Sequence, residues 1–191
     1  MVALSFDVGL ATCGAAVVRL HPREIELVRS SCFISTKSDK KRGVLSADDD
    51  LRRAEELGAW MGGLFDDVQP RVVVAERKSL PRNASAAGKI SIAWGVLSEQ
   101  RRTRKLPLVQ ASPQEVRRAL SLPKGATKLD VQAAVTKGRP EVMPMLTRWL
   151  LEEFPGHTPR QRELMHEHPV DAFAAFLACE LSEVVKAIRH G

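Results

Sequence analysis

Short apolar runs separated by turn residues occupy the start of the chain. Val2–Asp7 is an apolar run that ends in an acid, Cys13–Leu20 is apolar and β-branched, and Ile25–Ser35 has a similar character. Gly9–Gly14, between the first two runs, favours a turn. The pattern predicts a strand hairpin followed by a third strand.

Helical spacing of apolar residues begins after the third run. A helix capped by Asp48 or Asp49 is expected to end before Pro70. Its apolar positions at helical spacing are Leu51, Leu57, Trp60, Met61 and Leu64. The valine-rich run Arg71–Glu76 then lies between chain breakers, which indicates a strand covered on both faces.

The middle of the chain alternates helices with one more strand. Ala84–Arg104 is a predicted helix, and Leu106–Val109 is a predicted short strand. Ser112–Glu115 combines a cap residue, a proline at the first helical position and a capping-box acid, so a helix should begin there and stop near Pro123. Thr127–Asp130 marks another helix start.

The last quarter of the chain is predicted to be helical, with interruptions at prolines. Arg139–Pro140 breaks the pattern, Glu141–Glu153 resumes it, and Pro155–Pro159 interrupts it again. A last helix is expected from His168 to about His190. Its expected buried stripe is Phe173, Phe176, Leu177, Leu181 and Val184. Together the elements predict an α/β fold, a mixed five-stranded sheet flanked by helices on both faces.

Length and charge narrow the range of functions. The 191 residues, 44% of them hydrophobic, fit a single domain spanning 1–191. The formal net charge of +6 favours a polyanionic partner, either nucleic acid or an anionic membrane. No stretch is long enough for a membrane span, and the start of the chain does not resemble an export signal. We therefore expect a cytoplasmic protein with no membrane partner.

Three cysteines, Cys13, Cys32 and Cys179, lie far apart and lack the spacing of a zinc site. An odd number of widely spaced cysteines does not suggest a disulfide framework. We expect buried or half-buried reduced thiols, as in a cytosolic protein.

Acids at the ends of apolar strands are the strongest chemical signal. Asp7 and Glu76 each close such a strand, where burying an unpaired carboxylate costs several kcal/mol. Each therefore needs a cation or a strong donor. In His168–Asp171, the histidine and aspartate at i and i+3 point to the same side of a helix. These four side chains would be enough for two hard divalent ions, an arrangement that drives in-line phosphodiester hydrolysis.

Each of these residues also has a structural interpretation. Asp7 could bond the amides of the turn that follows, and Glu76 could pair with the basic residues after it. His168 and Asp171 could open a capped helix, and Glu167 is a competing ligand beside them. Singly, the structural interpretation is favoured for each residue. Their combination favours a metal site.

The same residues resemble RuvC-type Holliday-junction resolvases of the RNase H-like superfamily. Leu4–Gly9, the strand with Glu76, the helix reaching Gly95–Val96 and the motif His168–Ala172 match in type, order and approximate spacing. Gly125–Gln132 is similar to the lysine-containing helix start ahead of the family's last motif. The resemblance implies an RNase H-like nuclease that forms a homodimer, binds a four-way DNA junction and nicks two strands symmetrically, using Mg²⁺ or Mn²⁺.

The resemblance also implies roles for individual residues. The metal-binding catalytic residues would be Asp7, Glu76, His168 and Asp171. Lys128 and Arg117 would contact the phosphate backbone near the cut. In the family an aromatic wedge follows the catalytic glutamate, and its place here falls at Ser79, next to Leu80.

The implied mechanism uses two ions at one site. Asp7, Asp171 and His168 would hold the ion that activates the attacking water. Asp7 and Glu76 would hold the ion that stabilises the departing 3′ oxygen. Lys128 would offset the charge that develops on the phosphate.

Other basic residues are candidates for backbone contacts. Arg118 and Lys124 cluster with Arg117 and Lys128 around two helix starts, where phosphate binding arises from amides and cations together. The basic segment Lys37–Arg42 is a further candidate. The run Arg101–Lys105 ends a helix, where cations also complement the helix dipole.

Three other functions share parts of this pattern. Another RNase H-like nuclease, acting on flaps, RNA/DNA hybrids or transposon ends, would have the same metal site. An actin- or sugar-kinase-like ATPase also begins with Asp-x-Gly on a first hairpin, but the chain has no second glycine-rich phosphate loop and is short for two lobes. A binding-only module would not need every expected ligand.

Overall fold

The computed structural model describes residues 1–38, 45–77, 82–156 and 158–190, and in these residues five strands form one mixed sheet. The strand order is β3-β2-β1-β4-β5. The strands are β1 Val2–Asp7, β2 Thr12–Leu20, β3 Ile25–Ile34, β4 Val72–Glu76 and β5 Leu108–Ala111. The pairs β1–β2 and β2–β3 are antiparallel, whereas β1–β4 and β4–β5 are parallel. The predicted fold class is confirmed.

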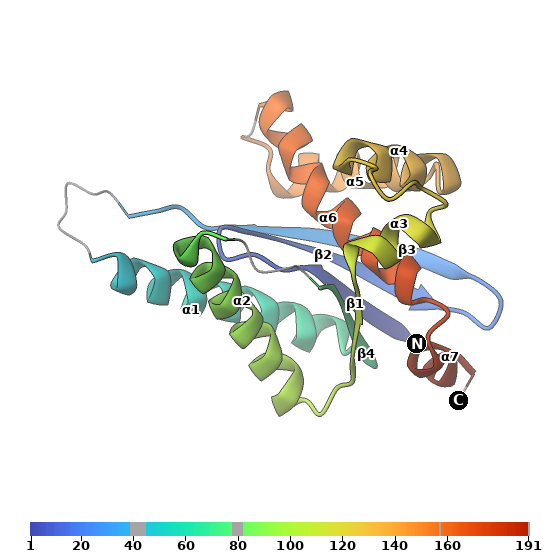
Figure 1. Cartoon of the computed structure of the whole chain (residues 1–191), viewed down its shortest axis with the longest axis horizontal. Coiled ribbons are helices and arrows are strands. Elements are labelled where there is room, and N and C mark those ends of the chain that lie inside the picture. The colour runs from blue at the N-terminus through green and yellow to red at the C-terminus, as the bar shows by residue number, and fades with distance from the viewer. Residues whose placement is uncertain (39–44, 78–81, 157, 191) are drawn as a thin grey trace.

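Helices cover both faces of this sheet. They are α1 Ser46–Val68, α2 Ala84–Thr103, α3 Pro113–Ala119, α4 Lys128–Gly138, α5 Val142–Glu153, α6 Pro159–Cys179 and α7 Glu183–His190. Figure 1 shows α1 and α2 on one face and α6 on the other, with α3, α4 and α5 around α6. No helix in the described part of the chain is long and apolar enough to cross a membrane.

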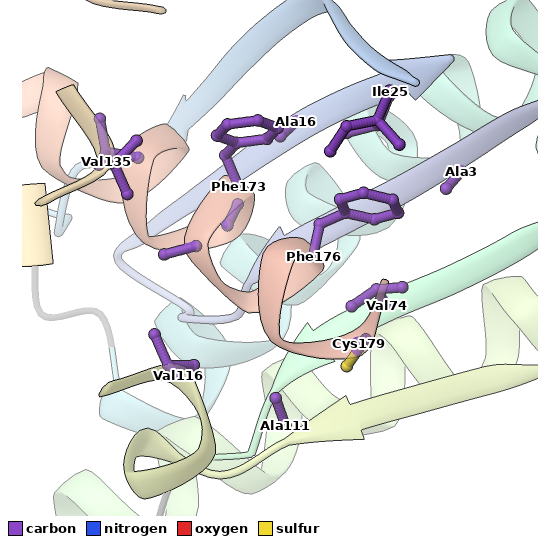
Figure 2. Close-up of a cluster of buried hydrophobic side chains, with 14 of the residues drawn as sticks. Ala3, Ala16, Ile25, Val74, Ala111, Val116, Val135, Phe173, Phe176 and Cys179 are labelled. Atoms are coloured by element: carbon purple, nitrogen blue, oxygen red, sulfur yellow. The ribbon is translucent and has the colours of Figure 1, made fainter. Parts of the chain in front are cut away.

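The alternation of side chains along β1 separates two hydrophobic cores. Leu4 and Phe6 face α1 and α2, whereas Ala3 belongs to the core beneath α6. Figure 2 shows Phe173 and Phe176 of α6 lying over the sheet in this second core. Small side chains on this face of the sheet leave room for the two rings. Residues at odd positions of β1 therefore point toward α6, and Asp7 is the last of them.

Helix α6 lies against the sheet backbone at the end of β1 and the start of β2. A Cβ on Gly14 would come within 2.2 Å of the backbone carbon of His168. The hydroxyl of Ser5, fully buried, donates a hydrogen bond of 2.6 Å to the carbonyl oxygen of Ala172. Gly14 pairs with Asp7 across β1 and β2. The missing side chain at Gly14 thus lets His168 approach Asp7.

The C-terminal helical prediction was wrong in two respects. The last segment forms two helices, because the chain turns after Cys179 and the Ser182 hydroxyl accepts a hydrogen bond from the Val185 amide at the start of α7. Leu181 and Val184 are consequently exposed, at 73% and 41%. Helix α6 also begins before the His168–Pro169 pair, so that pair does not open a helix.

Three smaller expectations were also wrong. Asp48 and Asp49 lie in the first turn of α1 and do not cap it. Leu51 is 61% exposed, because the buried stripe of α1 runs through Arg53 and Leu57. The fifth strand begins at Leu108, two residues later than predicted. The three cysteines are buried free thiols, as expected.

Replacing Gly14 by alanine should destabilise the protein, because the new methyl group overlaps the α6 backbone. We expect a loss of about 1–3 kcal/mol in the free energy of unfolding, typical of an overpacked core. Urea denaturation measures it. Gly63→Ala is the matched control: a Cβ there meets no atom within 4 Å, and alanine favours the helix. An unchanged unfolding free energy for Gly14→Ala would contradict the close approach.

Candidate active site

The first two acids lie at the same end and on the same face of the sheet. In the parallel register of β1 and β4, Phe6 pairs with Ala75, so Asp7 and Glu76 are the next residues on their strands. Val72 and Val74 belong to the core beneath α6, so the alternation of β4 also turns Glu76 toward that helix. Asp7 is 1% exposed.

Helix α6 brings the histidine and the third carboxylate to this spot. The Nδ1 atom of His168 lies 2.8 Å from Oδ2 of Asp7. Asp171, one turn further along, is 6% exposed. As their spacing predicted, both residues lie on the side of α6 that faces the sheet end. The interpretation of Asp7 as a simple turn cap does not account for its contact with His168.

A lysine from the start of α4 balances the buried carboxylates. At the predicted helix start, Thr127 and Asp130 form a capping box, which places Lys128 at the first position of the helix. The Nζ atom of Lys128 lies 3.2 Å from Oδ2 of Asp171 and also donates a hydrogen bond to Oε1 of Glu167. Glu167 therefore pairs with a lysine in this structure.

A hollow of about 160 Å³ opens between these elements. It is lined by Glu76, Pro113, Val116, Arg117, Lys128, Val131 and Asp171. Carboxylates from β4 and α6 thus share one space with cations from α3 and α4. Arg117 also donates a hydrogen bond of 2.9 Å to the Ala126 carbonyl, which braces the loop before α4. Arg118 and Lys124 are exposed.

The carboxylates influence one another through the low-dielectric interior. Burial, together with the negative charge of Asp7, raises the pKa of Asp171 to about 6, although Lys128 opposes the shift. Burial and the charge of Asp7 also raise the pKa of the Cys32 thiol to about 12. Desolvation would lower the pKa of Lys128, but its contacts with Glu167 and Asp171 outweigh it and raise that pKa. The raised pKa of Asp171 indicates that burying both carboxylates in their charged form is unfavourable.

These donors suit a hard divalent cation. Carboxylate oxygens are the ligands that Mg²⁺ prefers, and imidazole is accepted by Mn²⁺. Within the described residues, no three His, Cys, Asp or Glu side chains already surround one point as metal ligands. In this structure the Lys128 ammonium lies against Asp171 and the His168 ring lies against Asp7. The Asp171 carboxylate is already balanced by a positive group, the Lys128 ammonium. The charge and the donor atoms of these residues therefore fit a bound cation.

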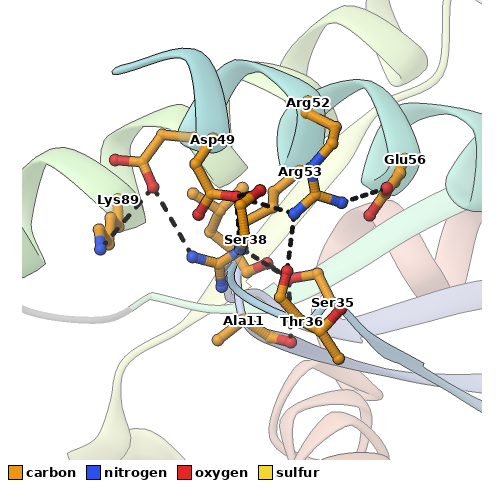
Figure 3. Close-up of polar contacts among 11 residues, drawn as sticks. Ala11, Ser35, Thr36, Ser38, Asp49, Arg52, Arg53, Glu56 and Lys89 are labelled. Atoms are coloured by element: carbon orange, nitrogen blue, oxygen red, sulfur yellow. Dashed lines mark hydrogen bonds and ion pairs between the residues drawn. The ribbon is translucent and has the colours of Figure 1, made fainter. Parts of the chain in front are cut away.

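Sequence reasoning missed a polar cluster behind the turn that follows Asp7 (Figure 3). Arg53, 1% exposed, donates from Nε to the Ser35 hydroxyl at 2.8 Å, and that hydroxyl donates to the Leu10 carbonyl at 2.9 Å. The contacts tie α1 to the β1–β2 turn. A signal was present, because position 53 continues the stripe of Leu57, Met61 and Leu64 at helical spacing.

Two predicted DNA-contact segments fall wholly or partly outside the described residues. Ser79 and Leu80, at the place of the wedge, lie outside the described residues. The basic segment Lys37–Arg42 is described only as far as Ser38, whose backbone amide and hydroxyl both bond to Asp49.

The raised pKa of Asp171 predicts how stability depends on pH without metal. A carboxyl whose folded-state pKa is raised contributes stability below its unfolded pKa near 4, and that contribution is lost as pH rises through about 6. Asp171→Asn removes this titration. Its unfolding free energy relative to the wild type should therefore rise between pH 4 and pH 8, by up to about 3 kcal/mol. Urea denaturation in EDTA measures it, and a difference independent of pH would contradict the assignment.

Comparison with known proteins shows that this chain is similar to the members of one family. The family described as "Crossover junction endodeoxyribonuclease RuvC" matches residues 3–138. A protein of that name from Chlamydia abortus is 32% identical over 135 residues, which cover 70% of this chain and 76% of the relative. One from Corynebacterium efficiens is 31% identical over 134 residues, 70% of this chain and 56% of the relative.

Solved structures show the same fold. "T. thermophilus RuvC in complex with Holliday junction substrate" matches with a TM-score of 0.64 at 18% identity, covering 93% of this chain and 92% of that one. The yeast mitochondrial Holliday junction resolvase matches with a TM-score of 0.59 at 12% identity, covering 98% and 81%. At these identities the matches establish the fold. The family match contains Asp7, Glu76 and Lys128 and ends before α6.

Proposed function

This chain belongs to the RuvC family of crossover junction endodeoxyribonucleases, and we propose that it resolves four-way DNA junctions by metal-dependent cleavage at the site formed by Asp7, Glu76, His168 and Asp171. The observation that carries the proposal is the meeting of β1, β4 and α6 at one end of the sheet. The contact between His168 and Asp7 joins residues 161 positions apart. Family membership supports the proposed reaction, and the contacts between these side chains support their assignment to the site.

Each residue has a part in the proposed reaction. Asp7 and Asp171, with His168, would hold one divalent cation, and Asp7 with Glu76 would hold a second. Bound ions at such a site supply a nucleophile at neutral pH and stabilise the departing oxygen. Lys128 lies at the rim of the hollow, where its ammonium can balance charge on the scissile phosphate. Arg117 lines the same hollow and is placed to orient that phosphate.

The proposed substrate and assembly follow from the reaction. A four-way junction has arms related by approximate twofold symmetry, so paired nicks require two copies of the site, which a homodimer supplies. We propose that Arg118 and Lys124, exposed near the hollow-forming elements α3 and α4, contact the DNA backbone.

Removing one carboxylate should abolish cleavage without weakening DNA binding. For Asp7→Asn and Glu76→Gln we expect nicking of a labelled immobile junction to fall by about 10²-fold or more, since each variant loses a ligand to the ions. Fluorescence anisotropy should give an unchanged junction affinity. Asp67→Asn, which removes an exposed carboxylate paired with Arg29, is the control and should cleave normally.

The same assay separates the related nucleases. A flap and an RNA/DNA hybrid are tested beside the junction with the wild-type protein. Preferential cutting of either would move the chain to another activity on the same fold. Undiminished junction nicking by Asp7→Asn or by Glu76→Gln would remove the substituted residue from the proposed site.

The imidazole in the donor set predicts a metal preference. His168 is a softer ligand than Mg²⁺ prefers, so Mn²⁺ should support cleavage at least as well as Mg²⁺. Cleavage rates titrated with each ion test this. Failure of Mn²⁺ to replace Mg²⁺ would count against His168 as a ligand.

A further inference from the structure

One ammonium group serves two carboxylates of α6. Glu167 and Asp171 lie four residues apart, so they occupy the same side of the helix. Lys128 contacts Oε1 of Glu167 and Oδ2 of Asp171. The side chain of Asp171 is 8% exposed, whereas that of Glu167 is 31% exposed. The buried acid and the more accessible acid therefore compete for the same cation.

Metal binding at Asp171 would disturb this arrangement. A divalent cation on the carboxylate of Asp171 would repel an ammonium held 3.2 Å from the same oxygen. Lys128 must then give up that contact. Its bond to Glu167 is the contact that can remain, because Glu167 is the more exposed of the two acids and is absent from the lining of the hollow.

The geometry points to Glu167 as a positioning residue that holds Lys128 and so limits how strongly this ammonium competes with divalent cations for Asp171. The inference rests on the proposed function, because it takes Asp171 as a metal ligand. With Glu167 present, Lys128 can release Asp171 and still remain at the rim of the hollow. Without Glu167, the ammonium keeps its contact with the Asp171 carboxylate and opposes metal binding there.

Glu167 is poorly placed to act as a ligand itself. Its side chain is 31% exposed, whereas those of Asp171 and Asp7 are 8% and 1% exposed. The carboxylate of Glu167 is instead occupied by Lys128. A ligand and a positioning residue predict different results when Lys128 is removed.

A double-mutant cycle on the full chain distinguishes the two roles. Mn²⁺ binding is measured without DNA, at pH 8, by the electron paramagnetic resonance signal of the free ion. The proteins are the wild type, Glu167→Gln, Lys128→Met and the double variant. Glu99→Gln, which removes an exposed acid paired with Arg102 far from the site, controls for net charge. Urea denaturation checks that each variant is folded, and Glu167→Asp, which keeps the charge, should retain most of the affinity.

We expect Glu167→Gln to weaken Mn²⁺ binding about fivefold, the size of a partly exposed ion pair, and Lys128→Met to tighten it. In the Lys128→Met background the Glu167 change should have less than a twofold effect. An equal loss in both backgrounds would overturn the inference, because Glu167 would then act directly on the ion.

If the proposed metal site itself is wrong, the Mn²⁺-binding measurements give a different set of results. If the wild type binds no Mn²⁺, or Asp7→Asn binds it equally well, the metal site itself is wrong and the role of Glu167 falls with it. If the wild type binds Mn²⁺ and Asp7→Asn does not, the site stands, and the cycle alone decides the role of Glu167.

Discussion

The carboxylate of Asp7, buried at the end of β1 beneath α6, is the constraint on which the rest of the site depends. An acid that is 1% exposed requires compensation, and here the compensation comes from a helix 161 residues away through His168. Gly14 admits the helix backbone, and the Ser5 hydroxyl binds it. Core packing and the geometry of the candidate site therefore depend on the same contacts, since the interactions that hold α6 on the sheet also place His168 and Asp171 beside Asp7.

Much of the fold was accessible from the sequence because its strands have distinct signatures. The valine run of β4 and the hairpin of β1 and β2 were enough to predict the sheet. The acids that close β1 and β4 identified two residues of the candidate site. The alternation of each strand then places both acids on the α6 face. That His168 and Asp171 lie on one side of a helix followed from helical spacing alone, although the helix begins earlier than expected.

What the sequence did not reveal depends on contacts between distant segments. The requirement for glycine at position 14 arises from the approach of α6, which no local pattern encodes. By residue type and position Glu167 competes as a metal ligand, and only the placement of α4 shows that it pairs with Lys128. Likewise, Leu181 matched a helical stripe, but Ser182 starts a new helix and leaves it exposed. In each case a tertiary contact overrode the local signal.

The central claim is that carboxylates from β1, β4 and α6 converge to bind divalent cations. Crystals soaked in Mn²⁺ and measured near the manganese absorption edge test it most directly, because anomalous scattering locates the ions. The strongest anomalous peaks should lie at the end of the sheet, in contact with Asp7 and bordered by Glu76 and Asp171. Ordered manganese elsewhere on the protein, with no peak beside Asp7, would contradict the claim.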